Sequence, residues 1–306
     1  MGERLNKKDY KGPVIVIVGP TGSGKTGASI EIVRELTGAD SASSADALLH
    51  RRTSSTAQSA TPASSHNLTP VSSRDFRGEI ISADSRAIYK GMDIGTAKPS
   101  HLEQQGVKHY GLDLVEPDER FTVADFKKYA EQKICSIRER GKVPIVCGGT
   151  GLYVDALAYN YQFSIEQKNC SKQHGEALSF AEKYPDRVKM STDYIIFGIK
   201  WPKEELRKRL KMRIDKMFCP ELYEETKRLV ERYGFENQAM KSDIYEYAWG
   251  YLEGKYSLEQ AKELCFFRDY HLAKRQMTWF KRNPEIKWLP IEAIKSAVLK
   301  EIEKFL

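Results

Sequence analysis

Eight residues near the start of the chain have the spacing of a phosphate-binding loop. They are Gly19, Pro20, Thr21, Gly22, Ser23, Gly24, Lys25 and Thr26, and they fit the pattern Gly-x-x-x-x-Gly-Lys-Thr. Backbone N–H groups of such a loop surround a polyphosphate at the positive end of the following helix dipole. Lys25 would neutralise phosphate oxygens, and the Thr26 hydroxyl would bind Mg²⁺. Because several enzyme classes share this loop, it predicts phosphate binding and leaves the reaction open.

A carboxylate, Asp84, follows directly after a short apolar segment that reads as a strand, residues 79–82. This position lies at the carboxyl edge of the predicted sheet, where open α/β folds bind their ligands. Asp84 would bind Mg²⁺, act as a general base or cap a helix. The residues alone leave these three roles open.

Strands and helices alternate around these residues. The β-branched segment 12–19 predicts a buried strand, and residues 26–36 predict the helix that follows it. We expect further strands over residues 79–82, 110–115, 142–147, 195–201 and 287–291. This alternation predicts an α/β fold, a P-loop NTPase-like parallel sheet flanked by helices.

A helix is expected between Thr122 and Arg140, and the chain after Pro202 reads as almost wholly helical as far as Arg282. In the first of these segments Thr122 is the predicted N-cap and Gly141 the stop signal. Its apolar residues fall on one helical stripe: Val123, Phe126, Ala130, Ile134 and Ile137.

Two segments interrupt the alternating pattern. Residues 40–76 hold ten Ser, four Thr and six Ala, too little apolar surface to order a folded segment. Residues 159–194 are short and polar. We therefore predict a P-loop core over 1–38 and 79–158, a disordered insertion over 39–78, a small, reduced inserted subdomain over 159–194, and a last core strand with a helical C-terminal part over 195–306.

Several motifs together resemble one family, the tRNA dimethylallyltransferases, which are isopentenyltransferases that prenylate tRNA. The resemblance rests on the phosphate-binding loop, on residues 80–99 (IISADSRAIYKGMDIGTAKP) and on residues 148–153 (GGTGLY). Residues 116–126 (EPDERFTVADF) and 273–280 (AKRQMTWF) resemble the same family. Several motifs in the family's order are far more specific than one loop.

The resemblance implies transfer of a dimethylallyl group from dimethylallyl diphosphate to N6 of the adenosine directly 3′ of the anticodon. The phosphate-binding loop would hold the diphosphate, with Mg²⁺ as the cofactor at Thr26. Loop amides, Lys25, the metal and a cationic side chain would stabilise the departing diphosphate. In this family reading Asp84, Thr26 and Arg213 are the catalytic residues, with Asp84 as the base and Arg213 in contact with the diphosphate.

The resemblance also implies a tRNA-binding set. Cations on one helix would contact phosphates, and Trp279 would stack on a base of a single-stranded loop. The alternative is that Trp279 and Phe280 are core residues with a solvated basic edge, which we expect at least for Phe280. The implied tRNA-binding residues are Asp84, Ser85, Arg86, Ala87, Thr150, Lys274, Arg275, Gln276, Thr278, Trp279 and Arg282.

Three features depart from the family pattern. Ala87 stands where many members have Gln, the 159–194 segment is shorter than the insertion that grips the tRNA stem in bacterial members, and the Ser/Thr-rich insertion is atypical. Arg209 and Arg213 would share one helix face, either toward a ligand or as a solvated basic face. His109 has no metal partner at a suitable spacing, so we expect it to be structural.

The composition sets limits on the class of protein. The 306 residues are 41% hydrophobic and 30% charged, as in ordinary globular chains, and no apolar run is long enough to span a membrane. Five scattered cysteines without a Cys-x-x-Cys pair predict a reducing, cytoplasmic location. The net charge is +7, with 23 basic and 18 acidic residues from Lys200 onward, which is consistent with a polyanionic partner there. We expect a monomer that binds the anticodon stem-loop.

Three other functions use some of the same residues. An isopentenyltransferase acting on free AMP or ADP would share the loop and the base, although the basic segment 274–282 favours RNA. The loop also permits an ATP-dependent kinase, but the other motifs do not support one. The last alternative is an RNA-binding relative that the reduced 159–194 segment leaves inactive, although all the polar residues that the chemistry needs are present.

Overall fold

The computed structural model describes residues 9–36, 76–163, 190–237, 239–241 and 243–306. The predicted disordered insertion falls mainly, and the reduced inserted subdomain largely, outside these described residues. The core resumes slightly earlier than the predicted boundary at residue 79, because Phe76 is already buried in the apolar core and Gly78 opens a strand.

A six-stranded sheet forms the centre of the molecule, and every strand pair in it is parallel. The strand order is β3-β2-β4-β1-β5-β6. The strands are β1 (Val14–Val18), β2 (Gly78–Ser82), β3 (His109–Tyr110), β4 (Val143–Gly148), β5 (Tyr194–Ile199) and β6 (Lys287–Leu289). The predicted parallel α/β fold is therefore confirmed, with most strand ends within two residues of the expected positions.

Helices cover both faces of the sheet, so alternate residues of β1 enter two different apolar clusters. Ile15 and Ile17 pack with apolar residues of α1 (Lys25–Glu35) and α11 (Ile291–Ile302). Val14, Val16 and Val18 pack on the other face with α4 (Val123–Glu139) and α5 (Gly151–Ala158). Burial on both faces explains the continuous apolar sequence of β1.

The helix predicted between Thr122 and Arg140 is α4, and its start is fixed by the expected cap. The Thr122 hydroxyl accepts a hydrogen bond from the Asp125 N–H at 3.2 Å, and the Asp125 carboxylate accepts one from the Thr122 N–H at 2.9 Å. The predicted stop, Gly141, has a φ of 69°. Left-handed backbone of this kind favours glycine and ends the helix.

The strand expected over residues 110–115 is wrong beyond Tyr110. The backbone turns at Gly111 and Asp113, whose φ values are 80° and 51°. An added Cβ at Gly111 would lie 2.6 Å from the Ser82 carbonyl oxygen, so the turn passes very close to the end of β2. Val115 then pairs with Tyr89 in an isolated bridge. A short helix, α3 (His101–Gln104), precedes β3 in the chain.

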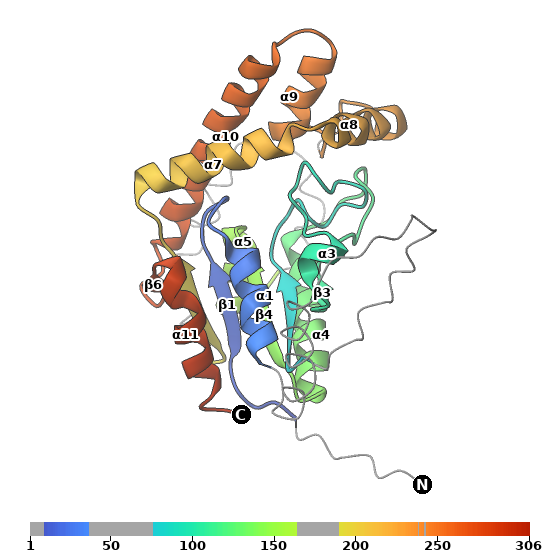
Figure 1. Ribbon diagram of the computed structural model, residues 1–306. Helices are drawn as coiled ribbons and strands as arrows, with labels where there is room; N and C mark the ends of the chain where they lie inside the picture. The colour runs from blue at the N-terminus through green and yellow to red at the C-terminus, as the bar shows by residue number, and fades with distance from the viewer. Residues whose placement is uncertain (1–8, 37–75, 164–189, 238, 242) are drawn as a thin grey trace, which may run out of the picture.

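The chain after Pro202 is helical, as predicted, and lies over the carboxyl edge of the sheet. It forms α7 (Lys203–Met217), α8 (Pro220–Tyr233), α9 (Asp243–Leu252) and α10 (Leu258–Phe280). Figure 1 shows α7 crossing above the carboxyl ends of the strands, while α10 passes behind α7 and reaches the level of the sheet. No helix in the described parts of the chain is both long and apolar enough to cross a membrane.

Candidate active site

A cavity of about 1360 Å³ lies between the carboxyl edge of the sheet and the helical part. The phosphate-binding loop forms one side of it. The segment that carries Asp84, the Gly148–Gly149–Thr150 turn, α7 and α10 supply the other sides. The structure thus brings the phosphate-binding loop and Asp84, which are far apart in the sequence, to one pocket.

The conformation of the phosphate-binding loop depends on glycine. Gly22 and Gly24 have φ values of 74° and 85°, which side chains rarely adopt. An added Cβ at Gly24 would also lie 2.7 Å from the Cδ1 atom of Ile291. The Trp201 indole N–H donates to the Ser23 carbonyl oxygen at 3.0 Å and supports the loop from outside. The glycine backbone and the Trp201 contact thus hold the loop in this form.

Lys25, the cation of the loop motif, opens α1. Its ammonium group donates to the Pro20 carbonyl oxygen at 2.8 Å. Desolvation lowers the pKa of Lys25, the nearby Cys147 and Asp84 act in the opposite direction, and Arg213 lowers the pKa further. A lysine held in this way is a strong partner for an added anion, because the anion would replace the missing solvation of the charge.

Thr26 lines the same cavity. No group of three or more His, Cys, Asp or Glu side chains is placed to hold a metal among the residues that the structure describes. Mg²⁺ binds oxygen ligands and often takes only one or two from the protein, with the rest from phosphates and water. The Thr26 hydroxyl and the Asp84 carboxylate fit this donor set.

Asp84 lies at the start of a turn just after β2. Its Oδ1 atom accepts hydrogen bonds from the N–H groups of Arg86, at 2.8 Å, and Ala87, at 3.4 Å. Residues 85–88 form a turn and no helix, so the helix-capping role left open by the sequence is replaced by a turn-capping one. The carboxylate still lines the cavity, which keeps the base and metal-ligand roles available.

Thr150 holds the Asp84 segment against the end of β4. Its Oγ1 atom accepts a hydrogen bond from the Ser85 N–H at 3.0 Å and donates to the Ser85 hydroxyl at 3.3 Å. Gly148 lets the two segments approach, since an added Cβ would lie 2.1 Å from the Ala83 carbonyl oxygen. Thr150, expected in contact with tRNA, therefore positions the neighbour of Asp84.

Gln276, expected to bind tRNA, uses both ends of its amide within the protein. Its Oε1 atom accepts a hydrogen bond from the Thr21 N–H at 2.7 Å, and its Nε2 atom donates to the Gly149 carbonyl oxygen at 3.0 Å. This side chain connects the phosphate-binding loop with the turn before Thr150. Gln276 therefore has a positioning role within the protein, and its expected contact with tRNA stays a prediction.

Arg209 and Arg213 share one face of α7, as the spacing predicts, and that face meets the phosphate-binding loop. Arg209 donates to the Gly22 carbonyl oxygen at 3.0 Å, and Arg213 donates to the Thr21 hydroxyl at 3.1 Å. Arg213 also pairs with Asp269 of α10 at 2.6 Å. The alternative of a solvated basic face does not hold. Nothing in the local sequence around Asp269 indicates a partner on α7, so the sequence alone does not predict this pair.

Trp279 belongs to the wall of the cavity. Its indole N–H donates to Asp155 at 2.8 Å, the Arg282 guanidinium lies 5.4 Å from its ring centre, and an added Cβ at Gly151 would lie 2.2 Å from its Cδ1 atom. The ring packs against the core and also lines the cavity, so stacking of a tRNA base on Trp279 stays a prediction. Phe280 is buried, as expected.

His109 and the remaining expected tRNA-binding residues differ in where they lie. Ala87 is 4% exposed, so its methyl group offers little contact area to a base. His109 lies in β3 and not in the lining of the cavity, and its Nδ1 atom lies 2.9 Å from the Val107 carbonyl oxygen, in line with a structural role. The remaining expected tRNA-binding residues line the cavity, as Ala87 does: Ser85, Arg86, Lys274, Arg275, Thr278 and Arg282.

The fold and this cavity define an α/β enzyme of the P-loop type, in which a phosphate-binding loop shares a pocket with a carboxylate. The family model described as IPP transferase matches residues 87–184 and 169–283. The chain belongs to this family, and the family resemblance expected from the motifs is confirmed.

Individual relatives agree with this family. A tRNA dimethylallyltransferase of Pelotomaculum thermopropionicum is 31% identical, and the alignment covers 94% of this chain and 94% of the relative. One of Staphylococcus epidermidis is 33% identical, over 90% of this chain and 86% of the relative. The crystal structure of the tRNA delta(2)-isopentenylpyrophosphate transferase of Staphylococcus epidermidis matches with a TM-score of 0.68 and 31% identity, over 96% of this chain and 98% of that one.

Proposed function

We propose that the chain transfers a dimethylallyl group from dimethylallyl diphosphate to N6 of the adenosine directly 3′ of the anticodon in tRNA. The observation that carries this proposal is the shared cavity of the phosphate-binding loop and Asp84. A diphosphate on the loop would direct its prenyl group into the cavity, where Asp84 faces the space for an adenine. Family membership supports the proposal, because the relatives are tRNA dimethylallyltransferases.

The phosphate-binding loop provides for departure of the diphosphate. Loop N–H groups, Lys25 and Arg213 stabilise the negative charge that develops as the allylic C–O bond breaks and its electron pair stays with the diphosphate oxygen. Trp201 holds the loop through the Ser23 carbonyl oxygen, and Asp269 pairs with the Arg213 guanidinium. When bound at Thr26, Mg²⁺ would neutralise further charge on the diphosphate.

Asp84 provides for attack by the acceptor. The N6 amine is a poor nucleophile because its lone pair is delocalised into the purine ring. As N6 forms its bond to the allylic carbon, Asp84 takes the proton that N6 must lose. General-base help at such a step is worth about 10² to 10⁴ in rate. The turn bonds at Oδ1 fix the orientation of the carboxylate.

The basic end of α10 provides for the RNA. Lys274, Arg275 and Arg282 line the same cavity and would contact phosphates of the anticodon stem-loop. This assignment favours tRNA over free AMP or ADP, because a mononucleotide has no use for cations spread along a helix. We further propose that the enzyme acts as a monomer. A cytoplasmic location is consistent with a tRNA substrate.

The test is incubation of the purified chain and Mg²⁺ with dimethylallyl diphosphate and total tRNA that lacks the modification. Nucleoside mass analysis should then find dimethylallyl-adenosine, and sequencing should place it 3′ of the anticodon. Parallel reactions with AMP and ADP should yield little product. Prenylated AMP without prenylated tRNA would overturn the proposal, and so would phosphate transfer from ATP without any prenyl product.

A further inference from the structure

One carboxylate, Glu225 of α8, accepts hydrogen bonds from three consecutive backbone N–H groups. Its Oε2 atom accepts from Asp93 at 3.1 Å and Ile94 at 3.0 Å, and its Oε1 atom accepts from Gly95 at 3.0 Å. Glu225 is only 4% exposed. A buried carboxylate is expensive to desolvate unless it is fully hydrogen-bonded, so this arrangement depends on the conformation of the 93–95 turn.

Tyr245 of α9 completes the contact. Its hydroxyl donates to Glu225 Oε1 at 2.6 Å, and its ring lies directly beneath Gly95, where an added Cβ would be 2.3 Å from Cζ. Burial, followed by the charge of Glu225, raises the pKa of Tyr245 well above its ordinary value. The hydroxyl therefore remains a donor at any physiological pH. Glu225 and Tyr245 together hold the turn from the side of the helical part.

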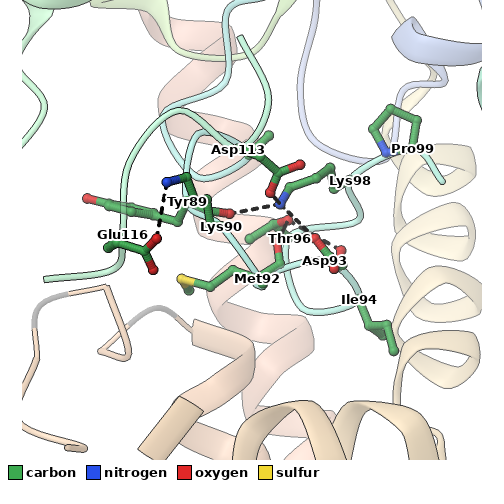
Figure 2. Close-up of polar contacts among 12 residues, drawn as sticks. Tyr89, Lys90, Met92, Asp93, Ile94, Thr96, Lys98, Pro99, Asp113 and Glu116 are labelled. Carbon is green, nitrogen blue, oxygen red and sulfur yellow. Dashed lines mark hydrogen bonds and ion pairs between the residues drawn. The ribbon is translucent and has the colours of Figure 1, made fainter. Parts of the chain in front are cut away.

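Lys98 holds the same turn from the other side. Its ammonium group donates to Asp93 Oδ1 at 2.7 Å, to Asp113 Oδ1 at 2.6 Å and to the Tyr89 carbonyl oxygen at 2.8 Å (Figure 2). The Lys98 side chain is only 5% exposed. Bonds from both sides leave the turn little freedom to shift.

Part of the cavity wall is formed by Gly95 of this turn and by residues that follow it: Thr96, Ala97 and Pro99. They belong to the segment that also carries Asp84. The phosphate-binding loop is held by bonds to other residues, among them Trp201 and Gln276. The 93–95 turn and the phosphate-binding loop are therefore held by different direct contacts.

We propose that Glu225, with Tyr245, is a positioning residue for the acceptor side of the cavity, coupling the helical part to the wall next to Asp84. The inference rests on the proposed function for the identity of the acceptor. Because the turn and the phosphate-binding loop are held by different direct contacts, we expect a change at the turn to act on the acceptor and not on the diphosphate. Weakening the Glu225 contacts should impair use of the tRNA acceptor and leave diphosphate binding unchanged.

The variants are Glu225→Gln and Tyr245→Phe, with Glu224→Gln as the matched control. Glutamine has the shape of glutamate, but its NH₂ group must face N–H donors of the turn. Phenylalanine keeps the ring beneath Gly95 and removes only the hydroxyl bond. Glu224 is the neighbouring residue on α8, its side chain is 73% exposed, and it pairs with Lys227 at the surface. If Glu225→Gln does not fold, Tyr245→Phe decides.

Three measurements test the proposal: amide hydrogen exchange at residues 93–95, the Kd for inorganic pyrophosphate, and kcat and KM for the tRNA acceptor. Loss of charge-assisted bonds should speed exchange and lower kcat/KM for tRNA by about tenfold or more in Glu225→Gln, and by less in Tyr245→Phe. The pyrophosphate Kd should stay within about twofold of wild type, and Glu224→Gln should behave as wild type.

Two results would overturn the proposal. One is unchanged exchange at residues 93–95 in both folded variants, which would show that the turn does not depend on Glu225. The other is an equal loss of pyrophosphate affinity and acceptor use, which would indicate a general structural role. Failure of the wild-type chain to prenylate tRNA would instead refute the proposed function, and the exchange measurement would still test the contact.

Discussion

The side-chain carbonyl oxygen of Gln276 lies 2.7 Å from the backbone nitrogen of Thr21, inside the phosphate-binding loop. The amide nitrogen of the same side chain bonds to Gly149, the neighbour of Thr150. Thr150 in turn holds Ser85, the neighbour of Asp84. A continuous series of contacts thus runs from the loop proposed to hold the leaving group to the proposed base, and it fixes their separation.

The first prediction concerns Gln276. In Gln276→Glu the contact with Thr21 can remain, but the donor to Gly149 is lost and a negative charge is added beside the diphosphate site. We expect the Kd for pyrophosphate to rise about tenfold or more, since one charge-assisted contact is worth that much. Isothermal titration calorimetry measures this Kd. The control Gln260→Glu adds the same charge to α10 and preserves the capping box at Ser257, so equal weakening there would contradict the prediction.

The second prediction concerns Asp84. Asparagine can still accept the Arg86 N–H bond that shapes the turn, but it cannot take a proton. We expect Asp84→Asn to lower kcat by about 10² to 10⁴, with the pyrophosphate Kd nearly unchanged. Single-turnover transfer to tRNA measures the chemical step. Wild-type rates in this variant would remove Asp84 from the role of base.

The third prediction concerns Asp269, which acts through Arg213. Asp269→Asn removes the charge that orients the guanidinium, and we expect kcat/KM for dimethylallyl diphosphate to fall about tenfold. In the double variant with Arg213→Met, Asp269→Asn should add little, because its effect requires the arginine. The control is Asp215→Asn, which breaks another α7–α10 pair, that with Lys262. Full additivity in the double variant would show that Asp269 acts elsewhere.

The fourth prediction is a pH dependence of donor binding. Desolvation lowers the pKa of Lys25 below its ordinary value of 10.5. The protonated form binds the anion, so affinity for pyrophosphate is fully present below the Lys25 pKa and is lost as the pH rises through it. The loss should begin at a lower pH than for an unperturbed lysine. Pyrophosphate Kd values for wild type and Lys25→Arg across pH 7 to 11 separate this effect from titration of the ligand. Parallel profiles for the two proteins would contradict the prediction.

The local sequence was a good guide where neighbouring residues decide the conformation. Glycines at fixed offsets and a β-branched run predicted β1 and the phosphate-binding loop, and Thr122 with Asp125 predicted the start of α4. The expected strand over residues 110–115 was wrong because Gly111 and Asp113 adopt left-handed backbone, where the chain passes the end of β2. That approach depends on a distant strand, so the local pattern did not reveal it.

The sequence by itself determined the parallel α/β fold, the phosphate-binding loop and the candidate base. These features arise from short-range periodicity and from residue types that suit only a few backbone conformations. Only the tertiary structure decided how side chains are used: Gln276 for two loops, Trp279 for the wall, Asp269 for Arg213 and Glu225 for a turn. Thr21 and Gln276 are 255 residues apart, and such contacts follow from how helices pack over the sheet, which no local pattern encodes.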